Sequence, residues 1–127
     1  MLAVVVLVGV AAMAGCQLGR VKQGVSLSSP DPNDRAKAVI IVGQSGDASA
    51  VGLLVDRLED EDEAVRFYAI QALVKIAGTD RGYRYYEPFW QRARAVRRWR
   101  SFLEIRADRA ASARAMSSAE HEGIVEE

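Results

Sequence analysis

The chain has 127 residues, of which 50% are hydrophobic and 27% are charged, as expected of one small folded domain with short extensions. Its 17 basic and 17 acidic side chains cancel, so the chain has no global electrostatic field. A single cysteine excludes an intrachain disulfide.

The cancellation hides a segregation of charge along the chain. Residues 31–80 contain ten acidic and five basic side chains, whereas residues 81–114 contain ten arginines and three acidic side chains. Four glutamates follow, and no basic residue accompanies them. This separation indicates either an internal electrostatic seam or a docking surface of one sign.

The N-terminal segment is apolar from residue 2 to residue 14. A helix of this length spans about 20 Å, which is too short to cross a membrane and is typical of the apolar part of a signal peptide. Ala14 and Gly15, directly before Cys16, resemble a bacterial lipobox. The resemblance implies that residues 1–15 are a signal peptide and that Cys16 is acylated, with fatty acids such as palmitate holding the protein on a bilayer.

Two features of this segment keep alternatives open. No lysine or arginine precedes the apolar run, whereas Arg20 and Lys22 follow it, and signal peptides have the reverse polarity. The alternatives are a true start upstream of Met1, or an uncleaved apolar segment with an incidental cysteine. Gln17, rather than an aspartate, follows the cysteine, and by the same resemblance this permits sorting to the periplasmic face of an outer membrane.

Residues 16–32 are predicted to be a flexible tether, because glycine, serine, proline and asparagine are frequent and periodicity is weak. An all-α domain is predicted beyond it, at residues 33–106. The helices expected from the spacing of apolar residues cover about 33–44, 48–59, 63–77 and 88–106, the last running on to about Ala119. Residues 107–127 are assigned to an Ala-rich, then acidic tail that is partly disordered.

The buried residues of each helix are expected at three- and four-residue steps. They are Ala38, Ile41 and Val42; Val51, Leu54, Val55 and Leu58; Val65, Ala69, Ala72, Leu73 and Ile76; and Phe89, Ala93, Val96, Trp99 and Leu103.

The sequence repeats itself at a shift of 31 residues, which places Asp31 on Asp62 and Arg35 on Arg66. Such a period is typical of a helical solenoid, in which hairpins stack side by side. The run L-x-D-x-D-x-x-V-R-x-x-A-x-x-A-L-x-x-I-x-G at residues 58–78 resembles a HEAT repeat of the PBS-lyase HEAT-like kind. The resemblance implies a short α-solenoid and says little about activity.

Four residues of this repeat are expected to have structural roles. Asp60 and Asp62 should accept the free N–H groups at the start of the third helix, and Gly78 should end that helix in a left-handed conformation. Arg66 is expected to lie across the acidic turn and to meet Asp60 or Asp62, as part of the packing between repeats. Calcium binding is disfavoured, because residues 59–63 lack the alternating ligands and central glycine of an EF-hand.

The fourth helix combines an apolar stripe with five arginines: Arg92, Arg94, Arg97, Arg98 and Arg100. Gly82-Tyr83 followed by Arg98-Trp99-Arg100 resembles the closing segment of some bacterial HEAT-repeat proteins. The resemblance implies that Tyr83 and Trp99 pack onto the last repeat as a cap. The alternative is a basic, aromatic helix that binds an anionic partner such as lipid headgroups or a wall polymer.

No catalytic or metal-binding constellation is apparent in the sequence. His121 falls in the expected tail, Cys16 is assigned to the lipobox, and no phosphate-binding loop, nucleophile elbow or metal-spaced ligand set appears. We therefore expect no enzyme activity and no cofactor. A subunit of a phycobilin-lyase-type enzyme is the remote alternative, suggested by the family nickname alone.

The function expected from these features is that of a lipid-anchored scaffold mediating protein–protein interaction at a bacterial cell envelope. The alternative is a peripheral membrane or wall-polymer binder acting through the terminal helix. Export argues against nucleic acid as a partner. About two repeats bury a small core, so we also expect marginal stability, or stabilisation by a protein partner or by self-association.

Overall fold

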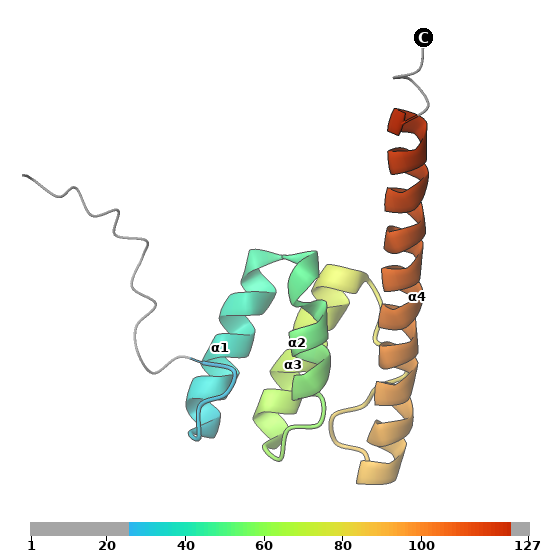
Figure 1. The fold of residues 1–127 in the computed structure, drawn as a ribbon. Coiled ribbons are helices and arrows are strands. Elements are labelled where there is room, and N and C mark those ends of the chain that lie inside the picture. The colour runs from blue at the N-terminus through green and yellow to red at the C-terminus, as the bar shows by residue number, and fades with distance from the viewer. Residues whose placement is uncertain (1–25, 123–127) are drawn as a thin grey trace, which may run out of the picture.

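A computed structural model of the chain describes residues 26–122 (Figure 1). The expected signal peptide, Cys16, the first part of the expected tether and the last residues of the tail lie outside the described residues. The described part is all helical, as predicted. It consists of α1 (Pro32–Ser45), the short 3₁₀ helix η1 (Ala48–Ala50), α2 (Val51–Arg57), α3 (Glu63–Ala77) and α4 (Phe89–Glu122).

The helices stack side by side rather than closing into a bundle (Figure 1). α1 packs along α3, α2 packs on α3, and α4 packs against α2 at the end of the stack opposite α1. Their shared core contains Val39, Leu54, Leu58, Leu73 and Trp99, each with no exposed side-chain area. Complete burial of one such aliphatic side chain contributes roughly 1.5–3 kcal/mol, so the contacts between helices hold the stack together.

The apolar faces of α2 and α3 follow the predicted spacing, but that of α1 differs. Ala38 is buried and Val42 is partly buried, whereas Ile41 is 56% exposed and Val39 takes the central position. The face of α1 is set by its contact with α3 along Val39 and Gly43, and Ile41 lies about half a turn away from that line.

The stripe expected on α4 is wrong at its first position. Ala95, Val96 and Trp99 are fully buried and Leu103 is partly buried, but Phe89 is 70% exposed. The contact of α4 with the core is made by Ala95, Val96 and Trp99, and Phe89 in the first turn of α4 lies outside it.

The domain begins earlier than predicted, whereas its last helix ends close to the predicted position near Ala119. At the N-terminal end, the side chain of Leu27 packs against the core, and its carbonyl oxygen accepts a hydrogen bond from Nη1 of Arg57 at 2.8 Å. Residues 27–32 therefore belong to the domain and not to the tether. At the other end, α4 continues through Glu122, and residues 104–120 are exposed. The expected tail is thus helical to that point, because no glycine or proline interrupts its alanines and arginines.

α1 lies close to α3 at Gly43. A Cβ atom there would lie 2.6 Å from the Cβ atom of Ala72 on α3. Only glycine therefore allows α1 and α3 to pack at this distance.

We predict that Gly43→Ala lowers the free energy of unfolding by about 1–3 kcal/mol, because the added methyl group forces α1 away from α3. Gly52→Ala on α2 is the matched control, since a Cβ atom at Gly52 would meet nothing within 4 Å. The control should be neutral or slightly stabilising. Urea unfolding followed by circular dichroism measures both, and equal effects of the two substitutions would contradict the prediction.

Candidate functional site

The most buried charged contact joins α1 to the turn after α2. Arg35 donates to the carboxylate of Asp60 from Nε and Nη2, both at 2.9 Å, and the two side chains are 8% and 3% exposed. The same guanidinium donates from Nη1 to the carbonyl oxygens of Ser29 and Pro30 at 2.9 and 3.1 Å. Arg35 therefore joins the N-terminal segment, the first helix and the acidic turn.

The acidity of Asp60 follows from this contact. Burial by itself would raise the pKa of Asp60, but the hydrogen bonds from Arg35 and from the Asp62 N–H, together with the charges of Arg35 and Arg57, hold that pKa below its usual value. The carboxylate is therefore the form that the fold stabilises.

Arg66 repeats this arrangement 31 residues later. It donates from Nη1 to the carbonyl oxygens of Asp60 and Glu61 at 2.9 and 2.8 Å, just as Arg35 binds the two carbonyls that precede its own helix. Its Nε donates forward to the carbonyl oxygen of Tyr85 at 3.2 Å. Arg66 thus lies on the acidic turn as expected, but it meets backbone carbonyls there and not the carboxylate of Asp60 or Asp62.

Asp62 and Gly78 define the ends of α3. The carboxylate of Asp62 accepts the N–H of Val65 at 3.0 Å, and Gly78 adopts a φ of 74° and donates its N–H to the carbonyl of Val74. Both roles match the sequence prediction. These two residues position the helix and do not form a ligand site.

The end of the stack is closed by Tyr83 and Trp99, as the sequence resemblance implied. The phenol of Tyr83 donates to the carbonyl oxygen of Leu58, and Nε1 of Trp99 donates to the carbonyl oxygen of Asp80 at 3.2 Å. Burial raises the pKa of Tyr83 above its usual value. Both aromatic rings therefore belong to the packing of α4 and not to a partner surface.

Two of the five arginines of the predicted anionic-partner surface are used within the molecule. Arg98 donates to the carbonyl oxygens of Arg81 and Gly82 at 2.8 and 3.4 Å. Arg100 pairs with the carboxylate of Glu59. Arg100, which also lies 3.9 Å from a carboxylate oxygen of Asp56, forms an electrostatic seam between α4 and the acidic end of α2, which was one of the two interpretations of the charge segregation.

The other arginines of the set have different surroundings. Arg92 is half-buried, and the exposed guanidinium of Arg94 lies 5.2 Å from the ring centre of Trp90. Arg97 is exposed and has no ion pair within the described residues. Arg94 and Arg97 are therefore the two arginines of this set best placed to meet a partner.

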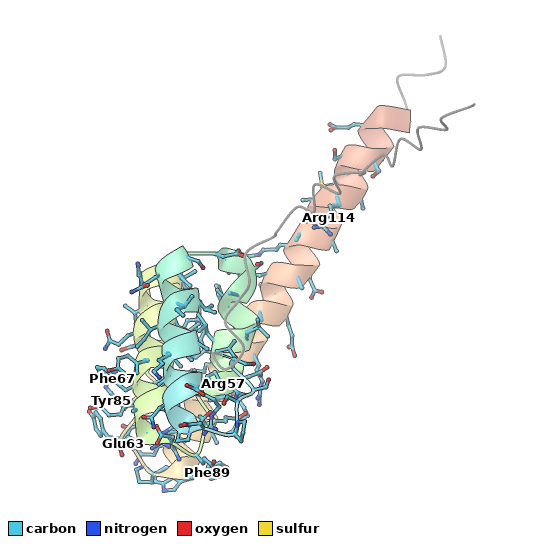
Figure 2. All side chains as sticks on the ribbon, turned by 90° about the vertical axis from the view of Figure 1, so that its left-hand side faces the viewer. Arg57, Glu63, Phe67, Tyr85, Phe89 and Arg114 are labelled. Carbon is cyan, nitrogen blue, oxygen red and sulfur yellow. The ribbon has the colours of Figure 1, made fainter. Side chains whose placement is uncertain are left out.

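A shallow groove of about 370 Å³ runs between α1 and α3, on a surface that sequence reasoning did not single out. Its lining is mostly apolar, and Tyr68 at its edge is 37% exposed. The lining residues are Ile40, Gly43, Gln44, Tyr68, Gln71, Ala72 and Lys75. Tyr68 also begins a row of edge-to-face aromatic contacts, of which the Phe67–Tyr85 pair is labelled in Figure 2.

Aromatic rings are exposed just before α4 and in its first turn, and sequence reasoning assigned them to no partner surface. Tyr86, Phe89 and Trp90 are 64%, 70% and 57% exposed. The sequence signal for exposed aromatic rings was the density of aromatic residues at 83–90. One buried stripe cannot accommodate so many rings, and Pro88 interrupts the segment.

Within residues 26–122, no cluster of histidine, cysteine, aspartate and glutamate has the geometry to hold a metal ion. In the same part of the chain, no helix combines the length and apolar character needed for a membrane span.

The ion pair at Asp60 generates a prediction about acid stability. Asp60→Asn leaves the guanidinium of Arg35 buried without its counter-charge, so the free energy of unfolding at pH 7 should fall by about 3 kcal/mol. The pKa of Asp60 is lower in the folded than in the unfolded chain, so its contribution is complete well above about pH 4 and is lost as the pH falls through the folded pKa. Urea unfolding at a series of pH values measures both effects.

Asp34→Asn is the matched control, because the ion pair of Asp34 with Lys37 spans 3.5 Å and its lysine is largely exposed. The control should change the free energy of unfolding by less than about 0.5 kcal/mol. Identical acid profiles for the unaltered chain and Asp60→Asn would show that the pair does not stabilise the fold.

Neither curated proteins nor solved structures give a match to this chain. The family described as HEAT repeats matches residues 25–101, which include α1, α2, α3 and the docked part of α4. The chain belongs to the HEAT-repeat family.

Proposed function

We propose that this protein is a non-enzymatic, lipid-anchored scaffold that binds a protein partner at a bacterial cell envelope. HEAT repeats generally serve as protein-interaction scaffolds, and the stacked helices α1 to α4 have the architecture such a scaffold needs. The more specific parts of the proposal are the binding surface and the anchor, which rest on different observations.

The groove between α1 and α3 is the observation that carries the binding role. It is apolar at its floor, where Gly43 and Ala72 meet, and polar at its rim, where Gln71 and Lys75 lie. An apolar centre with a polar rim is typical of protein interfaces. Exposed Tyr68 supplies an aromatic side chain of the kind that dominates binding energy at such surfaces.

The anchor is proposed from the lipobox resemblance at Cys16. The domain begins near Leu27, which Arg57 holds in place, so about ten residues connect it to the proposed lipid. A chain of that length reaches at most about 35 Å. The domain would therefore stay close to the membrane surface, where a scaffold collects partners.

The second candidate is binding of an anionic lipid or wall polymer by α4. Exposed Arg94 and Arg97, with Trp90 beside Arg94, favour it. Against it, Trp99 is buried, and Arg98 and Arg100 make contacts within the molecule. The groove therefore remains the better supported surface.

We predict that intact-mass analysis of membrane-extracted protein will find a chain that begins at Cys16 and carries the mass of several acyl groups. Cys16→Ser should leave the chain uncleaved and without the mass of the acyl groups, because a serine hydroxyl does not take the lipid. An unmodified thiol at Cys16, in protein that washes off the membrane, would refute the anchor.

We predict that a photo-crosslinking residue at position 68, in the groove, will capture a protein partner in intact cells. The same residue at exposed Ser49 is the control and should capture none. Tyr68→Ala combined with Lys75→Glu should lose the complex, whereas Arg94→Gln combined with Arg97→Gln should keep it. If the Arg94 and Arg97 double substitution lost the complex and the Tyr68 and Lys75 double substitution kept it, binding would be assigned to the terminal helix and the groove would be rejected.

A further inference from the structure

Three aromatic rings gather at the start of α4, where no part of the described fold covers them. Tyr86, Phe89 and Trp90 are 64%, 70% and 57% exposed, and they lie within five consecutive residues. The carbonyl oxygen of Pro88 accepts two backbone hydrogen bonds that open α4, at 3.0 and 3.1 Å, so the rings lie on an ordered turn. We call Tyr86, Phe89 and Trp90 the aromatic tip. Large exposed rings beside one another mark a binding surface.

The outer face of α4 next to this tip is basic. At about 100° per residue, Trp90, Arg94 and Arg97 fall within about 60° of one another, on the side of the helix opposite its buried contact with the core. Both arginines are exposed, and neither makes an ion pair within residues 26–122. Glu87 borders the same shallow pocket as Arg94 and Arg98, so two cations face one anion there. The charge left without a partner on this face is therefore positive.

The N-terminal segment lies at the same edge of the domain as the aromatic tip. α1, α3 and α4 all begin at this edge, which we call the base (lower end of Figure 1). Arg35 holds two carbonyl oxygens of the N-terminal segment beside the acidic turn, and Arg66 joins that turn to the carbonyl oxygen of Tyr85. About two helix spacings of roughly 10 Å separate α1 from α4, whereas the roughly ten residues between Cys16 and Leu27 reach at most about 35 Å. A bilayer that holds the proposed anchor is therefore within reach of the tip.

The acidic turn at residues 59–63 also lies at the base, but its charges are engaged within the fold. Four of its carboxylates each have an arginine nitrogen within 4 Å. The fifth, that of Asp62, accepts the N–H of Val65 at the start of α3. The turn therefore presents to an anionic surface no carboxylate that lacks a partner.

We propose that the aromatic tip inserts into the lipid–water interface of a bilayer and that Arg94 and Arg97 bind lipid phosphate groups. Aromatic side chains favour this interface, and a guanidinium pairs well with a phosphate. Arg94 and Arg97 lie about 6 and 10 Å from Trp90 along α4, so their long side chains reach a headgroup layer about 6 Å thick. The inference rests on the proposed anchor, which brings a bilayer to the base of the domain.

This contact gives the anchored domain one orientation. α4 leads away from the bilayer, with its arginine-rich residues 89–103 near the lipid and residues 104–122, which contain four acidic side chains, farther from it. The groove between α1 and α3 includes Gln44 and Lys75, near the C-terminal ends of these helices. The groove therefore extends away from the base and stays open to a protein partner.

Tryptophan emission reports the position of the tip. The chain has two tryptophans, of which Trp90 is exposed and Trp99 is fully buried. The detergent-extracted full chain is reconstituted into vesicles of phosphatidylcholine and phosphatidylglycerol, with or without phosphatidylcholine brominated near the top of its acyl chains. The bromolipid should quench the emission of the unaltered chain. It should leave the emission of Trp90→Phe unquenched, because the remaining Trp99 lies in the core.

Paired substitutions separate the tip from other exposed apolar side chains. Tyr86→Asp with Phe89→Asp should remove most of the quenching of Trp90, because charged side chains do not enter the interface as the rings do. Ile41→Asp with Leu53→Asp is the matched control and should keep the quenching. Ile41 and Leu53 are 56% and 55% exposed, and they lie on α1 and α2 away from the tip.

Arg94→Gln with Arg97→Gln should lower the ratio of inserted to free tips by roughly fivefold per arginine, because each loses its attraction to the anionic lipid. Quenching that either the tip pair or the arginine pair leaves unchanged would overturn the proposal. So would a chain that floats with the vesicles while its Trp90 emission is not quenched, and this result would leave the anchor intact.

Two further outcomes separate the tip from the anchor and from the cell wall. Quenching of Trp90 in a chain whose Cys16 carries no lipid would support the tip and refute the anchor. A blue shift of Trp90 emission with isolated cell wall, and not with vesicles, would assign the tip to a wall polymer and overturn the proposal.

Discussion

The fold depends on two buried arginines, Arg35 and Arg66, that hydrogen-bond to the turns on either side of their helices. A guanidinium is costly to bury unless its N–H groups are hydrogen-bonded. Nε and Nη2 of Arg35 donate to the carboxylate of Asp60, and Nη1 donates to the carbonyl oxygens of Ser29 and Pro30. This single side chain therefore fixes where α1 begins and where the turn after α2 lies. The same interaction requires Asp60 to be ionised, so it links the packing of the repeats to pH.

The repetition of this contact explains how the stack grows and where it stops. Arg66 binds the two carbonyls before α3 as Arg35 binds those before α1, but its forward partner is the carbonyl of Tyr85 and not a carboxylate. A shift of 31 residues from Asp60 leads to Gln91, which offers no charge for a buried arginine. From that point Tyr83 and Trp99 hold α4 by burial and by hydrogen bonds to backbone carbonyls.

Local signals in the sequence predicted local features. The caps at Asp62 and Gly78 and the buried face of α3 depend on residues within one or two turns of one another, and the structure confirms them. The partner of Arg35 could not be predicted, because Asp60 is 25 residues away and the choice among five consecutive acidic residues depends on how the helices stack. Ile41 and Phe89 were expected to be buried but are exposed, for a related reason. Periodicity defines an apolar stripe on a helix but does not show which part of that stripe contacts a neighbouring helix.

The two surfaces proposed for binding lie at opposite ends of the stack, and this arrangement makes them compatible. The groove is formed by α1 and α3, whereas the outer face of α4 lies beyond the last contact with α2 (Figure 1). A partner held in the groove would therefore leave Arg94 and Arg97 on α4 free to meet an anionic surface. The proposed anchor would keep the groove close to the bilayer, so a partner bound to the same membrane would meet it at high effective concentration.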